Sequence, residues 1–323
     1  MKKILSRFSV NSKVLAVLFI LIMIIGMSSH QNFFSVRNFM AISQQMSEIG
    51  IMAIGMTLVI ITRGIDISTG TAMGLFAIVT ALCMRAGLPV ILTVIISLAT
   101  AMLCGALNAF MIANIRVPAM IATLGTQLFF NGIALALSRG GTISSIYESY
   151  YFLGQGKIAD ILPVQAFILI VIAVFVHIVL TKRRLGKQIF AIGNNIEAAR
   201  FSGINTNRVL FIVYISCAVL SCVAGNIQVA RVTTARADMG TVYMMQCISA
   251  VVLGGTSISG GKGGVGGTIV SVLVFTMVGN IMNLSGVSPH WQTLVTGLIM
   301  VAVLVFNRIT EGRKRIKAVL DMA

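Results

Sequence analysis

The sequence predicts an all-α membrane protein, a bundle of about ten transmembrane helices that occupies residues 1–323 as a single domain. Apolar residues make up 57% of the chain and charged residues only 10%, whereas soluble domains usually contain about 25% charged residues. Long apolar runs, such as 91–113 and 294–306, favour helices over the ~10-residue alternating segments of a membrane β-barrel. A helical span needs about 20 residues, so ten spans fit into 323 residues.

The predicted spans follow the apolar runs in order. They cover residues 14–30, 45–62, 67–84, 88–113, 119–137, 162–181, 208–230, 241–258, 265–284 and 291–307. The first span follows a basic N-terminus, as a signal peptide would, but we interpret it as an uncleaved span because no small-x-small cleavage site follows it. Only Arg63–Asp66 separate the second span from the third.

Positive charge predicts which side each connection faces. With the N-terminus inside, 18 of the 24 basic residues face inside, and the outer ones are Arg37, Arg85, Arg139, Lys157, Arg231 and Arg236. Short cytoplasmic loops carry an excess of Lys and Arg, so we expect both termini in the cytoplasm. Two connections are long: 182–208, predicted to be cytoplasmic, and 138–162, predicted to be periplasmic.

Several classes of function are disfavoured by the composition. The net charge of +16 is explained by cytoplasmic loops, so we expect no nucleic-acid partner. The five cysteines form no CxxC, and the three histidines are isolated, so we predict no metal site, no cofactor and no catalytic residues. A Walker A motif would need Gly at Thr256 and Ser or Thr at Gly263, so ATP would have to be hydrolysed elsewhere.

One cytoplasmic segment departs from the apolar pattern. Residues 195–202 predict a short helix, which Asn194 or Asn195 can cap and which has Glu197 in its first turn. Gly203 can terminate it. Such a helix either docks on a partner or lies on the membrane surface, and the residues alone leave both interpretations open.

The same segment carries a family resemblance. Glu197-Ala198-Ala199 followed by Gly203 resembles the coupling loop of ABC transporter permeases, and residues 197–205 resemble its version in bacterial ribose, xylose and galactose importers. Further ordered matches stand at 55–68, 121–126, 250–263 and 283–287, so that the resemblance covers about residues 30 to 307. Arg63 departs from the pattern, because a small or polar residue is expected there.

The resemblance implies the transmembrane permease subunit of an ATP-driven monosaccharide importer in the bacterial inner membrane, with a ribose-like pentose or a hexose as cargo. It implies three protein partners: a second permease subunit, identical or different, an ATP-binding subunit and a periplasmic sugar-binding protein. The chain itself would not be an enzyme. The residues expected to couple it to the ATPase are Glu197, Ala198, Ala199, Arg200 and Gly203. Alternatives are another small polyol, such as a furanosyl signalling molecule or a deoxysugar, and a stand-alone secondary transporter.

A neutral sugar is bound by amides and hydroxyls. Polar residues at helical spacing make up the predicted substrate path, namely Asn108, Thr123, Gln127, Asn131, Asn280 and Asn283. The alternative is that these side chains join helices to one another. The acids Glu48, Asp66 and Asp238 are predicted near span ends. A proton-coupled carrier usually buries an ionisable residue at mid-membrane, so this placement favours ATP-driven import.

Two further features are left with two interpretations each. The outer connection holds Tyr147, Tyr150, Tyr151 and Phe152, which suit the membrane interface or stacking on a sugar. Residues 64–70 and 255–261 match at four of seven positions, which reflects an internal repeat or chance.

Asp238, predicted outside, could meet a basic patch on the binding protein.

Overall fold

The computed structural model describes residues 10–29, 31–144, 146–159, 162–288, 290–299, 301–302 and 305. The helices are α2 (Val10–Ser29), η1 (Gln31–Phe34), α3 (Val36–Ile61), α4 (Thr69–Arg85), α5 (Val90–Ala109), η2 (Phe110–Asn114), α6 (Ala119–Ser138), α7 (Glu148–Gln155), α8 (Val164–Lys182), α9 (Arg184–Asn194), α10 (Ile196–Phe201), α11 (Thr206–Val232), α12 (Thr241–Leu253) and α13 (Val265–Leu284). Residues 290–299 are helical as well. Strand β1 (Lys157–Ile158) pairs antiparallel with β2 (Leu162–Pro163).

The described residues form a polytopic helical bundle. Six of their helices are long and apolar enough to cross a membrane: α3, α5 continued by η2, α6, α8, α11 and α13. The apolar helices α4 and α12 have 17 and 13 residues. At 1.5 Å per residue, α12 extends about 20 Å, which is less than the ~30 Å hydrocarbon core. The prediction of helical spans is therefore confirmed for six of them.

Two predicted boundaries are wrong, each for a local reason. The second span was predicted from 45, but α3 begins at Val36 because Ser35 caps it, with Oγ accepting from the Asn38 N–H at 3.2 Å. The eighth span was predicted to run to 258, but α12 ends at Leu253. Gly255 follows with a φ of +93°, a backbone conformation that ends the helix and favours glycine.

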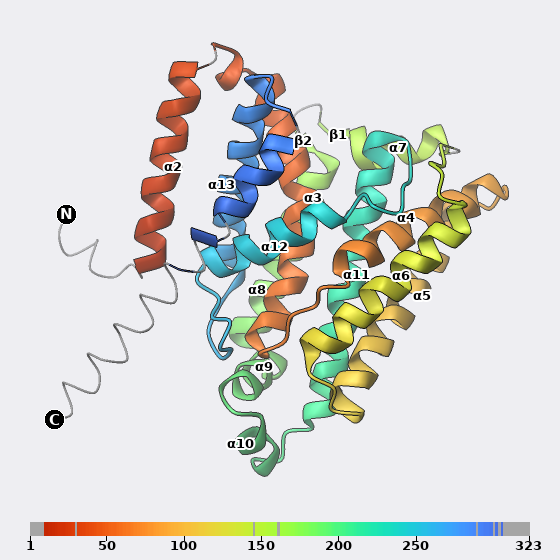
Figure 1. Cartoon of the computed structure of the whole chain (residues 1–323), viewed down its shortest axis with the longest axis vertical. Coiled ribbons are helices and arrows are strands. Elements are labelled where there is room, and N and C mark those ends of the chain that lie inside the picture. Colours follow the sequence, from red (N-terminus) through yellow and green to blue (C-terminus); the bar gives the residue numbers. More distant parts are fainter. Residues whose placement is uncertain are drawn as a thin grey trace.

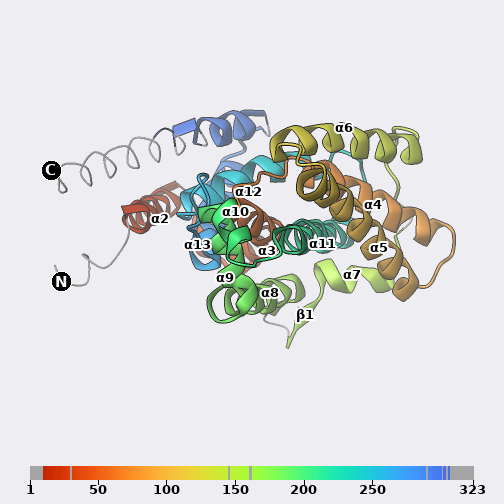
Figure 2. The ribbon, with the colours of Figure 1, turned by 90° about the horizontal axis from the view of Figure 1, so that it is seen from below.

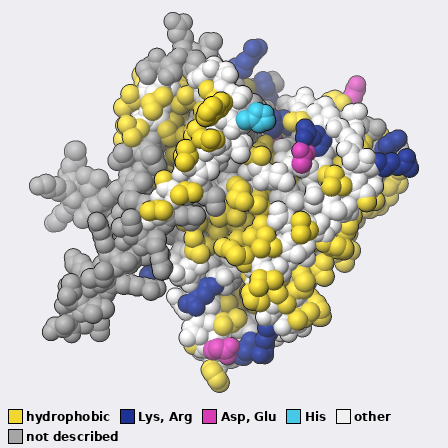
Figure 3. Space-filling model, in the orientation of Figure 1, with side chains coloured by type: hydrophobic (Ala, Val, Ile, Leu, Met, Phe, Trp, Pro, Cys, Tyr) yellow, Lys and Arg dark blue, Asp and Glu magenta, His cyan; other side chains and the backbone are white. Residues whose placement is uncertain are grey.

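Helices α3 and α11 pack against each other at the centre of the bundle. Helix α11 also packs on α4 and α5, while α3 packs on α8, α12 and α13. Helix α6 packs on α4, and Figure 2 shows α6 and α8 on opposite sides of α11. The connection that contains α9 and α10 lies at one end of the bundle and α7 lies toward the other (Figure 1). Hydrophobic side chains cover the middle of the face in Figure 3, with charged side chains toward its ends.

Candidate functional site

The short helix predicted in connection 182–208 is α10. Asn195 caps it, because its Oδ1 accepts hydrogen bonds from the backbone N–H groups of Glu197 at 3.0 Å and Ala198 at 3.1 Å. Gly203 follows with a φ of +78°, the left-handed conformation that commonly ends a helix. Both ends of α10 are therefore defined by the residue types that the sequence analysis identified.

The two faces of α10 separate the five predicted coupling residues. Ala199 is buried in the core cluster of the protein, where its small side chain lets the helix pack closely. Glu197, Ala198, Arg200 and Gly203 are exposed. An Arg200 Nη1 and a Glu197 Oε1 lie 3.3 Å apart along the helix. The exposed surface of α10 therefore has a small side chain, Ala198, in its middle and carries one acid paired with one base.

Phe201 is the residue that the sequence analysis missed. It is the last residue of α10 and its side chain is 89% exposed. Aromatic residues are enriched in the cores of protein interfaces, and an exposed aromatic ring beside small side chains is suited to insert into a partner's pocket. The signal available in the sequence was an aromatic residue directly before Ser202 and Gly203 in an otherwise polar and small segment.

Arg63 fixes the position of the helix that precedes α10. Its Nε donates to the carbonyl oxygen of Gly193 at 2.7 Å and an Nη donates to the carbonyl oxygen of Asn194 at 2.5 Å. These are the last two residues of α9. Arg63, which departs from the family pattern, therefore joins the end of α3 to the end of α9, directly before α10.

The glycine-rich segment 254–264 meets the same junction. The Gly261 N–H donates to the carbonyl oxygen of Ile61 at 2.9 Å. A Cβ on Gly193 would lie 1.9 Å from that carbonyl oxygen and 2.5 Å from the Gly261 nitrogen, so only glycine allows this approach. The end of α9 is therefore in direct contact with the turn after α3 and with the connection between α12 and α13.

Two predicted substrate-path residues fasten the turn before α4. Asp66 Oδ1 accepts from the Ser68 N–H at 3.0 Å, and Asn108 Nδ2 donates to Ser68 Oγ at 2.8 Å. Thr126 Oγ1 donates to Asn108 Oδ1 at 2.7 Å. Thr123 Oγ1 donates to the carbonyl oxygen of the residue before Asp66 at 3.0 Å. In this structure Asn108 and Thr123 are thus hydrogen-bonded within the bundle, joining α5 and α6 to this turn.

The other four predicted path residues lie elsewhere. Asn280 is buried and exchanges two hydrogen bonds with Asn38 of α3, at 2.7 and 3.0 Å. Asn283 is exposed and accepts from Gln292 Nε2 at 2.7 Å. Gln127 and Asn131 lie half-buried on α6. The structure therefore divides the six residues among three regions of one subunit instead of gathering them around one cavity.

The expectation that the acids lie at span ends is wrong for Glu48. Because α3 begins early, Glu48 lies in the middle of that helix, with no exposed surface. Its Oε1 accepts from Arg231 Nε at 2.5 Å, and its Oε2 accepts from Arg231 Nη2 and from the Tyr243 hydroxyl, both at 3.0 Å. Arg231, predicted in an outer loop, is the penultimate residue of α11. The ion pair joins α3 to α11, and the hydrogen bond from Tyr243 joins α12 to both.

The outer tyrosines are held by hydrogen bonds. Tyr150 of α7 is buried and donates to Asn226 Oδ1 of α11 at 2.7 Å, while the Tyr147 hydroxyl donates to the carbonyl oxygen of Met84 at 2.8 Å. Burial raises the pKa of the Tyr150 phenol, so it stays a neutral donor. Phe152 is 61% exposed.

Among the described residues, no three His, Cys, Asp or Glu side chains are grouped for a metal ion.

Comparison with known proteins gives consistent similarities. The profile of the family described as branched-chain amino acid transport system / permease component matches residues 38–304. The chain is 37% identical to the ribose import permease protein RbsC of Escherichia coli K12, over 92% of this chain and 94% of that one. It is 34% identical to RbsC of Bacillus subtilis, over 90% of each chain. It is 32% identical to the galactose/methyl galactoside import permease protein MglC of Escherichia coli K12, over 88% and 90%. No solved structure matches.

Proposed function

The chain belongs to the permease-component family described for branched-chain amino acid transport systems, and from that membership we propose that it is the membrane subunit of an ATP-driven monosaccharide importer. Like its relatives, it is a multi-pass inner-membrane transport subunit and not an enzyme. The family description names amino acids, but relatives at 32 to 37% identity are import permeases for ribose and galactose. A pentose or a hexose is therefore the preferred cargo.

The observation that carries the coupling mechanism is the placement of α10. The helix presents an exposed surface, which ends in Phe201, at one end of the bundle. Its neighbour α9 is fastened by Arg63 to the turn after α3, and Gly193 of α9 packs closely against Gly261 in the segment before α13. A movement imposed on α10 by an ATP-binding subunit would therefore reach two distant parts of the bundle directly. On this basis Glu197, Ala198, Arg200, Phe201 and Gly203 form the docking surface, with Ala199 behind it.

The proposed topology has ten spans in one domain, residues 1–323. To the six long apolar helices it adds α2, α4, α12 and the helix at 290–299. Connection 182–208 is cytoplasmic and 138–162 is periplasmic, in keeping with their placement toward opposite ends of the bundle. In Figure 1 the first residues of α2 lie nearer than its last residues to the end where α9 and α10 lie, which supports a cytoplasmic N-terminus. Residues 1–9 and 306–323, which carry the terminal charges, lie outside the described residues.

Helix α6 is the proposed face for the second permease subunit, identical or different. It packs on α4, and its outward residues are apolar and more than 40% exposed: Ile121, Leu124, Leu128, Phe129 and Leu135. Gln127 and Asn131 lie half-buried on the same helix. If two subunits meet at α6, these amides face the space between them. Together with Asn108, Thr123, Asn280 and Asn283 they remain the proposed residues of the sugar path.

The periplasmic sugar-binding protein is proposed to dock beside the outer end of α6. A polar cavity of about 300 Å³ there is lined by Asn131, Arg236 and Asp238, among others. Arg236 and Asp238 form an exposed ion pair at 2.6 Å, which offers both signs of charge to a partner. Another small polyol or deoxysugar as cargo would use the same surfaces, and only the sugar path would differ.

The docking proposal is tested with the variant Glu197→Lys combined with Gly203→Leu. In proteoliposomes that contain the complete importer, we expect ATP-dependent sugar uptake and ATPase association to fall together, because one change reverses a charge and the other strains the exit from α10. The matched control is Lys157→Glu, a charge reversal at the opposite end. Unchanged uptake and association in the double variant would show that α10 is not the docking site.

A further inference from the structure

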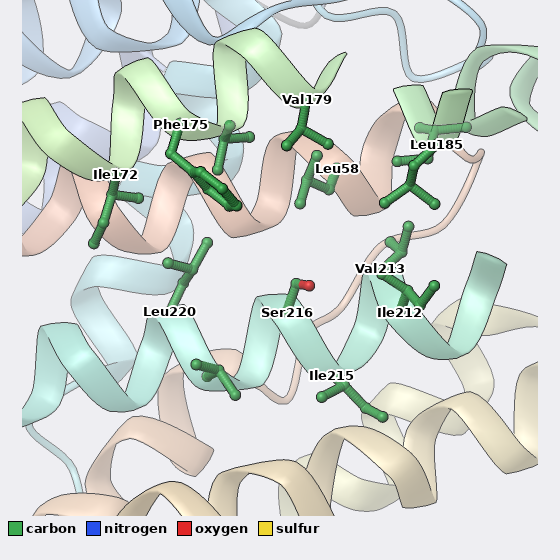
Figure 4. Close-up of a pocket in the computed structure, with 13 residues that line it drawn as sticks. Leu58, Ile172, Phe175, Val179, Leu185, Ile212, Val213, Ile215, Ser216 and Leu220 are labelled. Carbon is green, nitrogen blue, oxygen red and sulfur yellow. The ribbon is translucent and has the colours of Figure 1, made fainter. Parts of the chain in front are cut away.

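The described structure contains an apolar crevice whose lining includes none of the residues proposed for the sugar path. It lies between α8 and α11, and Leu58 of α3 forms part of its lining. Its volume is about 410 Å³, which is within the ~300–1,000 Å³ usual for ligand pockets. Figure 4 shows side chains of α8, such as Phe175, facing those of α11, such as Leu220. Ser216 is the sole polar side chain among its lining residues.

The crevice occupies the cytoplasmic half of both walls. The lining residues of α8 run from Ile172 to Val179, near the helix end at Lys182, and those of α11 run from Ile212 to Leu220, near its start at Thr206. Leu185 and Ile189 of α9 complete the lining. Phe175 of the lining is 65% exposed, so the crevice reaches the surface of the bundle. Since α8 lies on the far side of α11 from α6 (Figure 2), this surface is away from the proposed contact between permease subunits.

Both walls end in basic residues at the same side. Along α8, Lys182 lies three residues after Val179, which continues the lining stripe of the helix. Along α11, Arg208 lies four residues before Ile212 and so shares its face. Arg183 follows directly at the C-cap of α8. The first turn of α9 contributes two more cations on either side of Leu185, namely Arg184 and Lys187.

These cations are available to a ligand. Lys182, Arg183 and Arg208 are exposed, and in the part of the chain that the structure describes their side chains take part in no ion pair or hydrogen bond. The acid of the same connection, Glu197, is paired with Arg200. Within the described ranges, the positive charge at this end of the apolar crevice therefore has no protein counter-charge.

From this combination we infer that the crevice is a binding site for one anionic phospholipid of the cytoplasmic leaflet. An acyl chain would fill the space between α8 and α11. Its methylenes would make van der Waals contacts that the lining side chains of the crevice otherwise lack. The phosphate would lie among Lys182, Arg183 and Arg208. Basic pockets between transmembrane helices on the cytoplasmic side are known to take such headgroups. A zwitterionic lipid would fit the crevice but would gain little from the cations.

The site can be tested with phosphatidylglycerol that carries a photoreactive diazirine in its acyl chain. The full-length chain in phosphatidylcholine nanodiscs receives a small fraction of this probe, and crosslinked peptides are mapped by mass spectrometry. We expect labelling concentrated in residues 172–179 and 212–220. A phosphatidylcholine probe with the same acyl chain should label these segments at least tenfold less, because about fivefold in affinity is expected for each cation that meets the phosphate.

Two variants separate the tail site from the headgroup site. Ser216→Phe fills the crevice and should abolish the concentrated labelling, whereas Val174→Phe, an equally apolar change at a 53% exposed position of α8 outside the lining, should not. Replacement of Lys182, Arg183 and Arg208 by Gln should reduce phosphatidylglycerol labelling to the phosphatidylcholine level, and Lys262→Gln should leave it unchanged.

Three outcomes would overturn the inference. Equal labelling by both probes would show that the crevice takes any lipid of the annulus. Labelling spread evenly over the exposed faces of α5, α6 and α8 would show no site. Retention of the label after Ser216→Phe would place the acyl chain outside the crevice. None of these outcomes bears on the transported sugar or on the docking of α10.

Discussion

The buried pair of Glu48 and Arg231 predicts an asymmetric response to mutation. Glu48 has no exposed surface and accepts three hydrogen bonds, whereas 28% of the Arg231 side chain is exposed. Removing the cation leaves a buried carboxylate uncompensated, which costs about 3–5 kcal/mol. Removing the negative charge leaves a cation that can extend toward water, so Glu48→Gln should cost less, about 2 kcal/mol for the lost charge-assisted hydrogen bonding. Arg231→Met should therefore destabilise the protein more than Glu48→Gln.

The measurement is the free energy of unfolding in mixed dodecyl maltoside and sodium dodecyl sulfate micelles, followed by circular dichroism. The double variant Glu48→Gln/Arg231→Met closes the cycle and should lie within about 1–2 kcal/mol of the unmodified chain, because no charge is then left unpaired. Asp238→Asn, which breaks an exposed pair with Arg236, is the control and should change stability by less than about 1 kcal/mol. Equal costs for the two single variants, or additive costs in the double variant, would refute the reasoning.

Three further predictions concern the junction of α3, α9 and α10 and the polar turn before α4. Phe201→Ser should leave the free energy of unfolding within about 0.5 kcal/mol of the unmodified chain, yet weaken binding of the ATP-binding subunit about tenfold or more. Binding is measured by titrating that subunit onto the purified permease, and undiminished binding would exclude Phe201 as an anchor. Arg63 has a φ of +66°, so Arg63→Gly relieves backbone strain that Arg63→Ala retains, and the Ala variant should be less stable than the Gly variant by about 1 kcal/mol. Both variants should lower the amount of sugar transported per ATP in proteoliposomes. Normal coupling in both would show that the junction does not transmit movement. Asn108→Leu removes the hydrogen bonds that Asn108 makes with Asp66, Ser68 and Thr126, although each of these residues keeps another partner. The loss should cost about 2–4 kcal/mol in the same unfolding assay, at ~0.5–1.5 kcal/mol per hydrogen bond; a cost below about 1 kcal/mol would contradict the assigned network.

The fold class could be predicted from the sequence because the membrane imposes a simple rule on composition. A span needs a long apolar run with few charges, and residues 119–137 and 265–284 were placed almost as α6 and α13 have them. The errors arose where helix ends depend on local chemistry that hydropathy does not register. Ser35 starts α3 early and Gly255 follows the early end of α12, and neither changes the mean hydropathy of its surroundings much.

The polar residues were harder to assign, because a single chain carries no record of which helices meet. Asn108 and Thr123 were selected as sugar ligands from their helical spacing, yet both make hydrogen bonds to the turn around Asp66. Arg63 stood out in the sequence only as a departure, and its partners, the carbonyl oxygens of Gly193 and Asn194, lie far along the chain. Backbone acceptors have no sequence signature, so such a contact cannot be predicted from residue types.

The sequence by itself determined that this protein lies in a membrane, that it is helical and that residues 196–201 form the short helix α10. Each of these depends on local composition or on capping residues within a few positions. Only the tertiary structure decided where the charges act. It buried Glu48 against Arg231 inside the bundle, turned Ala199 inward and Phe201 outward, and aligned the basic ends of α8 and α11 beside one apolar crevice. These arrangements depend on how distant helices pack, since a side chain's partners across the bundle are set by helix contacts and not by its neighbours in sequence.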